Sequence, residues 1–93
     1  MAYIDVALDD DLDVVSASRV KSWLSAAIAA NPGGTLRLDM AEVDFLDSTG
    51  LGLLMGALLG ARSSGGDVLL ARANPAVTAA LTVTGLDRVF SFE

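Results

Sequence analysis

The sequence contains neither cysteine nor histidine among its 93 residues. Without cysteine the chain forms no disulfide, and without both residues it has no Cys/His zinc site and no haem attachment site. The same absences exclude cysteine nucleophiles, histidine general bases and Ser-His-Asp triads. Carboxylates, hydroxyls and six basic residues remain for chemistry. The composition therefore favours binding or switching over catalysis, and we expect no enzyme, no cofactor and no metal.

Aromatic residues make up only 5% of the chain, whereas 53% of the residues are hydrophobic and the mean hydropathy is +0.54. A chain of this composition can bury a core, which must consist mainly of aliphatic side chains and alanine. Its length fits one domain and leaves little for a second. We therefore predict a single domain over residues 1–93.

Basic residues are also scarce, since 6 of them face 12 acidic residues and give a net charge of −6. Nucleic-acid binding needs a basic footprint, and an anionic membrane surface attracts basic segments, so both partners are disfavoured. Five aspartates fall within the first thirteen residues: Asp5, Asp9, Asp10, Asp11 and Asp13. We expect any charged partner to present a basic or metal-bearing face.

Long hydrophobic runs are absent as well. The longest, residues 51–61, would form a helix of roughly 16 Å, whereas the hydrocarbon core of a bilayer is about 30 Å thick. The N-terminus has no basic segment followed by an apolar stretch, so it does not read as a signal peptide. These patterns predict a cytoplasmic protein without membrane insertion.

Strand and helix patterns alternate along the chain. We predict strands near residues 3–8, 36–40, 68–71 and 89–92, with helices after Asp13, over 48–63 and after Asn74. Asp13 or Ser16 can cap the first helix, whereas Asn74 with Pro75 is typical of a helix start and Gly85 of a helix end. Such alternation predicts parallel strand pairs with right-handed crossovers in a small α/β layer.

The aspartate run has part of a calcium-loop pattern. Asp9, Asp11 and Asp13 have the D-x-D-x-D spacing that opens an EF-hand loop. That loop also needs glycine at its sixth position and glutamate at its twelfth, where this chain has Val14 and Val20. The oxygen count is then too low for calcium, so the run predicts a solvated acidic loop or a partner surface.

A second motif is Asp47-Ser48-Thr49-Gly50. Small homodimeric aspartic proteases carry D-[ST]-G in chains of about this length, which leaves that enzyme as a weak alternative. Here an extra residue separates the aspartate from the glycine, and a helical pattern follows in place of an all-β one. The phosphate-loop reading fails too, because Gly50-Leu51-Gly52 has no following lysine at the required spacing.

Three glycines, Gly52, Gly56 and Gly60, form a stripe at helical spacing. Each costs a helix about 1 kcal/mol relative to alanine, so the stripe needs a compensating role. Close approach of this helix to the sheet is the interpretation we favour. The alternative is a smooth surface against which another protein packs.

Ser48 and Thr49 lie where a helix is expected to begin, with unpaired backbone N–H groups and a positive dipole end. Serine there is commonly a plain N-cap. It can also be a phosphoacceptor, because a phosphate adds about −1.5 to −2 charges that the helix end can accommodate while the charge repels a partner.

Several segments together resemble a known family. Residues 47–52, following residues 38–40 and 43–46, are similar to the signature of STAS domains, notably bacterial anti-sigma factor antagonists. Residues 10–13 stand where that family usually has Gly-Glu-Leu-Asp, and residues 64–66 and 76–86 match the rest of its pattern. The likeness extends from about Asp10 to Phe92.

The resemblance implies an α/β fold with a mixed sheet of about four strands and helices mainly on one face, without the usual C-terminal helix. It also implies a switch, in which Ser48 is phosphorylated by a partner that is both a serine kinase and an anti-sigma factor. The unphosphorylated form binds that partner and releases the sigma factor, and a phosphatase resets the cycle.

Carried over residue by residue, the family's partner-contact surface implies five positions in this chain: Asp13, Asp47, Thr49, Gly50 and Leu51. The short termini would leave apolar surface and a sheet edge that a homodimer or a strand exchange could cover. Other short STAS proteins serve as accessory subunits of lipid-transport ABC ATPases or as parts of stress-signalling assemblies, and these remain alternative functions.

Overall fold

A computed structural model describes residues 3–93. Its strands are short, and its helices are of ordinary length. The elements in chain order are β1 (Tyr3–Ala7), α1 (Ala17–Ala30), β2 (Thr35–Asp39), α2 (Ser48–Ser63), β3 (Asp67–Ala71), α3 (Pro75–Thr84), the 3₁₀ turn η1 (Leu86–Arg88) and β4 (Ser91–Phe92).

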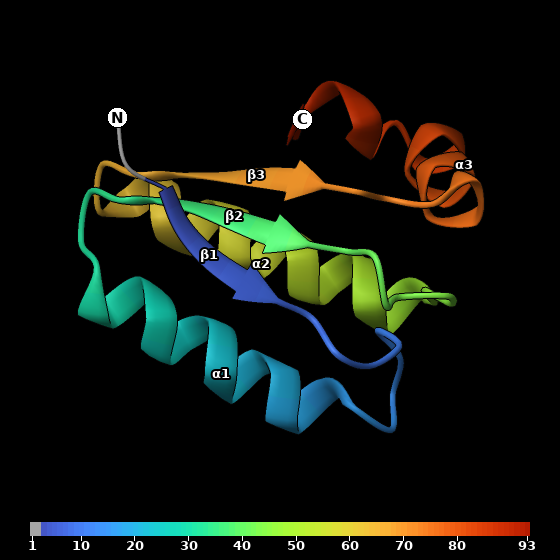
Figure 1. Ribbon diagram of the computed structural model, residues 1–93, viewed down its shortest axis with the longest axis horizontal. Coiled ribbons are helices and arrows are strands. Elements are labelled where there is room, and N and C mark those ends of the chain that lie inside the picture. The colour runs from blue at the N-terminus through green and yellow to red at the C-terminus, as the bar shows by residue number, and fades with distance from the viewer. Residues whose placement is uncertain (1–2) are drawn as a thin grey trace.

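The four strands form one sheet in the order β1-β2-β3-β4 (Figure 1). Every pair in it is parallel, so the expected four-stranded α/β fold is confirmed but its mixed sheet is wrong over residues 3–93. The reason is the connections: a helix lies between each strand and the next, and such a crossover returns the chain in the same direction.

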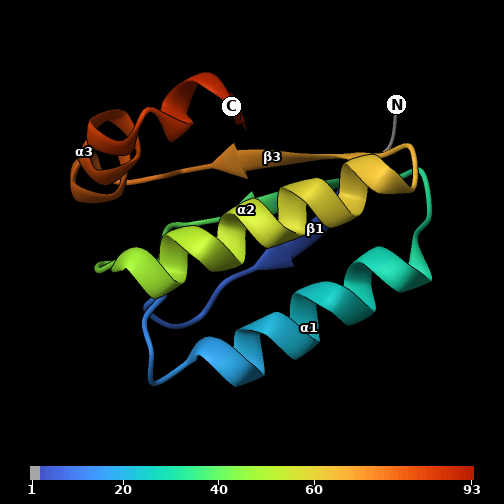
Figure 2. The same cartoon turned by 180° about the vertical axis from the view of Figure 1, so that it is seen from behind.

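Helices α1 and α2 lie together on one face of the sheet, as expected, whereas α3 lies beyond the end of β3 (Figures 1 and 2). Alternate side chains of the central strands point into this helical layer. Leu36 and Leu38 of β2, with Val68 and Leu70 of β3, are almost completely buried there. Leu54 and Leu58 of α2 meet them from the helical side and are fully buried.

The opposite face of the sheet carries charged side chains. Arg37 of β2 pairs with Asp5 of β1, at 2.5 Å, and with Glu93, while Arg72 pairs with Asp39. The hydrogen bond from Arg72 is the main reason why the pKa of Asp39 lies below its usual value. In the part of the chain that the structure describes, α1 and α2 lie on the other face, and the charged side chains of this face pair with one another.

The predicted start and end of α3 are confirmed. The Asn74 side chain accepts a hydrogen bond from the N–H of Val77 at 2.9 Å, Pro75 is the first helical residue, and Gly85 ends the helix with a φ of +78°. After η1 only Ser91 and Phe92 pair with β3, so the last strand is shorter than expected.

The expected cap of α1 is wrong. Ser16 stands at the N-cap position, but its side chain makes no cap hydrogen bond and instead donates to the carbonyl of Asp11. Asp13 accepts from the N–H groups of Val15 and Ser16, both at 3.0 Å, before the helix begins. Both side chains stabilise the preceding loop.

Among the helices of residues 3–93, none combines the length and apolar composition needed to cross a bilayer.

Candidate functional site

The site is built around the first turn of α2, which begins at Ser48. Asp47 is its N-cap in extended backbone conformation, and one carboxylate oxygen accepts from the N–H of Gly50 at 2.9 Å. The other oxygen accepts from the N–H of Val14 at 3.3 Å. Asp47 therefore holds both the start of α2 and the acidic loop, which we define as residues 9–16.

Backbone pairing joins the same two segments. Leu12 forms an isolated parallel bridge with Leu46, and the N–H of Asp47 donates to the carbonyl of Leu12 at 3.1 Å. The Asp11 carboxylate accepts from the N–H groups of Asp44 and Phe45, at 2.9 and 3.1 Å. The acidic loop and the segment before α2 thus form one hydrogen-bonded unit, whose surface includes Ser48.

Gly50 allows the start of α2 to pack closely against the acidic loop, a contact that we call the joint. A Cβ added at Gly50 would lie 2.8 Å from the carbonyl carbon of Leu12 and closer still to its oxygen. Real side chains do not approach a backbone carbonyl so closely, and the backbone of Leu12 is held by its pairing with Phe45 and Leu46. A glycine is therefore required where α2 passes the acidic loop.

Ser48 and Thr49 are both exposed in the first turn of α2. Neither hydroxyl takes part in the hydrogen bonds found among residues 3–93. The cap that the sequence allows for Ser48 is supplied by Asp47 instead, so the serine hydroxyl has no structural task in the described chain. It is exposed at the N-terminal, positive end of the α2 dipole.

The five predicted contact positions differ in exposure although they lie around one turn. Thr49 is exposed, and Asp13, Asp47 and Leu51 are half-buried. Gly50 is buried, so its observed contribution is the close approach to Leu12. Direct contact of any of these residues with a partner stays a prediction.

Three exposed apolar side chains beside this turn were missed from the sequence. Val14 and Val15 of the acidic loop are 70% and 90% exposed, and Phe45 is 55% exposed. Val14 is tied to Asp47, and Phe45 to Asp11, by the hydrogen bonds described above. The signal was available, because two valines are unusual in a solvated acidic loop and Phe45 directly follows a further aspartate, but only the fold brings the loop against the segment before Ser48.

The carboxylates of the aspartate run have partners other than a cation. Asp9 and Asp10 pair with Arg19, at 3.4 and 3.0 Å, and those of Asp11 and Asp13 accept backbone N–H groups. Within residues 3–93 the structure has no cluster of three or more side chains that could hold a metal.

Both carboxylate oxygens of Asp47 accept hydrogen bonds from backbone N–H groups. Asp47 is therefore a structural cap, and its surroundings give no support to the protease alternative.

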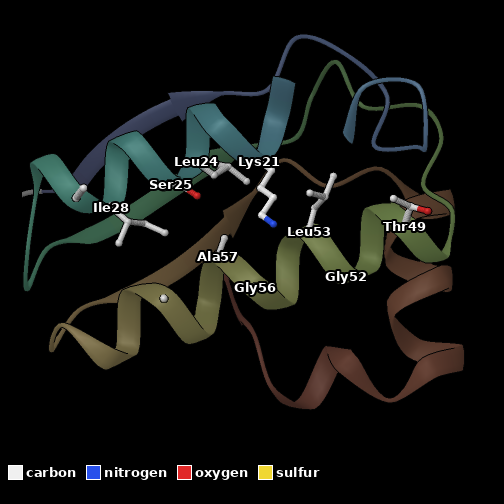
Figure 3. Close-up of a pocket in the computed structure, with 11 residues that line it drawn as sticks. Lys21, Leu24, Ser25, Ile28, Thr49, Gly52, Leu53, Gly56 and Ala57 are labelled. Atoms are coloured by element: carbon white, nitrogen blue, oxygen red, sulfur yellow. The ribbon is translucent and has the colours of Figure 1, made fainter. Parts of the chain in front are cut away.

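The glycine stripe does not face the sheet, so the favoured interpretation is wrong. A Cβ added at Gly52 or Gly56 would meet nothing within 4 Å, and one at Gly60 would make only an ordinary contact with Ile28. The sheet-facing side of α2 holds Leu54 and Leu58 instead. The stripe borders a groove between α1 and α2 (Figure 3).

Comparison with known proteins gives a consistent result. The family model of the STAS domain matches residues 3–93. An anti-sigma-B factor antagonist of Listeria monocytogenes is 29% identical over 91 residues, which is 98% of this chain and 79% of that protein. An anti-sigma-B factor antagonist of Bacillus subtilis is 30% identical over 83 residues, covering 89% of this chain and 74% of that protein.

Solved structures share the fold. A Thermotoga maritima protein superposes with a TM-score of 0.83 at 27% identity, over 95% of this chain and 77% of its own. The anti-sigma factor antagonist SpoIIAA in its unphosphorylated form gives 0.79 at 22% identity, over 98% and 79% of the two chains. At 22% identity the likeness to SpoIIAA concerns the fold alone.

Proposed function

The chain belongs to the STAS domain family, and we propose that it is an anti-sigma factor antagonist controlled by phosphorylation of Ser48. The observation that carries the proposal is the exposed Ser48 hydroxyl, free of structural bonds among residues 3–93, on a turn that Asp47 and Gly50 fix in place. Two anti-sigma-B factor antagonists that match most of this chain support the antagonist part of the proposal.

The unmodified surface suits a protein partner. Val14, Val15 and Phe45 present apolar area on the hydrogen-bonded unit whose surface includes Ser48, and apolar side chains of this kind form the centres of protein interfaces. The surrounding aspartates complement a basic rim. Under this proposal the anti-sigma factor binds here and releases its sigma factor.

Phosphorylation would reverse binding through charge. A phosphate on Ser48 adds about −1.5 to −2 charges beside the carboxylate of Asp47. The N-terminus of α2 tolerates that charge, so the fold persists. A partner surface that is apolar or acidic at this point would lose affinity, because burying an unpaired charge is costly.

Under this proposal the chain is a substrate and a ligand. The partner supplies the kinase activity and the ATP, a serine phosphatase restores the free hydroxyl, and residues 1–93 act as one STAS domain without catalysis of their own. Since sigma factors act on RNA polymerase, we place the switch in the cytoplasm.

The first experiment tests the modification site. The chain is incubated with the anti-sigma factor kinase of its genome and ATP, and phosphate is located by mass spectrometry. We expect one phosphate, lost in Ser48→Ala and retained in Ser63→Ala, which changes a serine at the far end of the same helix. Phosphate that survives in Ser48→Ala would contradict the proposal.

The second experiment tests the surface. Val15→Asp places a charge in the proposed contact, whereas Val83→Asp does so at a similarly exposed valine, 86% against 90%, on α3. We expect Val15→Asp to weaken anti-sigma factor binding at least tenfold and Val83→Asp to leave it unchanged, as measured by calorimetry. Equal effects, or co-purification with an ABC ATPase in place of the anti-sigma factor, would favour the alternative functions.

A further inference from the structure

A groove of about 530 Å³ runs between α1 and α2 on the outer side of the helical layer. Its walls are mainly aliphatic: Leu24 and Ile28 come from α1, and Leu53 and Ala57 from α2. In Figure 3 the Ile28 side chain points from α1 toward α2. The groove is separate from the acidic loop and meets the proposed switch only at Thr49.

The floor of the groove is bare helix backbone. Gly52 and Gly56 have open space where a Cβ would stand, so no packing contact within residues 3–93 requires glycine there. Alanine would favour the helix at both positions. Larger side chains would reduce the depth of the groove, and the three glycines keep it open over about 12 Å from Gly52 to Gly60.

Few polar groups line this apolar channel. They are the Lys21 ammonium and the Ser25 hydroxyl from α1 and the Thr49 hydroxyl from α2. Lys21 points across the groove in Figure 3 and takes part in none of the ion pairs between residues 3 and 93, which all involve arginines. Lys21 is also the one charged side chain of the lining.

The volume of the groove, its lining residues and its single charged side chain indicate what kind of ligand it can bind. Small-molecule sites occupy about 300–1,000 Å³, lie between helices and combine apolar walls with a few polar groups. A single unpaired cation beside an apolar channel complements an anion with an aliphatic body. The net charge of −6 repels anions at long range, but salt screens that repulsion beyond about 8 Å, so the local cation decides.

We propose that this groove binds a free aliphatic monocarboxylate of about eight to ten carbons. The carboxylate pairs with the Lys21 ammonium, and the chain lies over the glycine floor between Ile28 and Leu53. The protein would then have a small-molecule binding site that is separate from the proposed phosphorylation site at Ser48.

The probe is octanoate, with 1-octanol as a neutral ligand of the same chain length. Titration of ¹⁵N-labelled protein should give saturable shifts of the Gly52, Gly56 and Gly60 amides, with a Kd of order 1 mM for a ligand of this size. Lys21→Met should weaken octanoate about fivefold and leave 1-octanol unchanged, because an exposed ion pair contributes about that factor. Lys21→Arg should restore octanoate binding.

A second variant tests the floor. Gly56→Leu places a side chain into open space, so the fold should persist, as circular dichroism checks, while both ligands lose binding. Leu59→Ala is the matched control, because Leu59 is on α2, 59% exposed and outside the groove. It should bind octanoate like the parent chain.

Three results would overturn the proposal. One is octanoate binding that is unaffected by both Lys21→Met and Gly56→Leu. Another is amide shifts that require phosphatidylglycerol vesicles and do not occur with free octanoate, which would indicate a membrane surface. The third is glycine shifts that appear on concentrating the protein alone, which would mean that a second copy covers the groove. No partner or phosphate is needed, so failure here leaves the proposed function untouched.

Discussion

Gly50 and Gly56 belong to the same helix and have opposite surroundings. A Cβ at Gly50 would stand 2.8 Å from the carbonyl carbon of Leu12, whereas one at Gly56 would meet nothing within 4 Å. The first glycine is fixed by the fold, because no larger residue lets α2 pass the acidic loop. The second is not needed for packing at all. A glycine that costs stability without serving the fold indicates a role outside the folded chain itself.

The comparison extends to the two regions around these glycines. The first turn of α2 is held by the Asp47 carboxylate and by the bridge between Leu12 and Leu46. The side of α2 that carries Gly52 and Gly56 borders the groove toward α1, and Lys21, which also lines that groove, has no ion pair among residues 3–93. The first region is held in position by hydrogen bonds and carries the exposed Ser48 hydroxyl, whereas the second contains the groove of about 530 Å³.

The largest expected effect comes from Gly50→Ala. The added methyl group must displace the Leu12 backbone or the start of α2, and overpacking against fixed groups costs up to about 3 kcal/mol. Urea unfolding should show a loss of that order in the free energy of unfolding. A loss under about 1 kcal/mol, comparable to that of an exposed substitution, would mean that the backbone at Leu12 moves aside easily. Gly50 would then be no more constrained by packing than Gly56.

Asp47→Ala comes next. It removes the cap on the Gly50 N–H and the acceptor of the Val14 N–H, and we expect a loss of about 2 kcal/mol in the free energy of unfolding. Asp47→Asn keeps one acceptor oxygen and should lose about half as much. If both variants unfold like the parent chain in urea, the acidic loop is not held by this side chain.

Gly56→Ala should change stability in the opposite direction. Alanine gains about 0.5–1 kcal/mol over glycine in a helix and meets no obstacle at this position. Gly52→Ala should behave alike, and the two effects should add within about 0.5 kcal/mol if the sites are independent. Destabilisation by either change, measured in the same urea assay, would show that the open side of α2 is packed after all.

Local patterns were enough to predict much of this fold. The bounds of α2 were predicted as 48–63 and observed at Ser48–Ser63, and α3 has the predicted cap at Asn74 and end at Gly85. Each of these signals resides within a few residues. The place of Ser48 in the first turn of α2 was likewise predicted, because a hydroxyl at a helix start is a local feature; its phosphorylation stays a prediction.

What failed required knowledge of distant contacts. The hydrogen bond from Val14 to Asp47 spans 33 positions, and no local pattern reveals that Gly50 touches Leu12. The glycine stripe was assigned to the sheet side because close approach there would compensate for the cost of glycine in a helix. The apolar residues around the stripe give the helix no preferred face from sequence alone. Only the packing of Leu54 and Leu58 on the strands decides which side remains open.

The smallest expected effect on stability is that of Ser48→Asp. A carboxylate at the first turn gains about 0.3–1 kcal/mol from the helix dipole, and repulsion from Asp47 offsets part of it. The free energy of unfolding should therefore change by less than about 0.5 kcal/mol, and the change should shrink further in 1 M salt, where the Debye length is about 3 Å. A loss as large as that of Asp47→Ala would mean that a charge at residue 48 disrupts the joint itself. If stability is nearly unchanged and anti-sigma factor binding is lost, the charge acts at the exposed surface of α2. It would then not act through the contacts between Gly50 and Leu12.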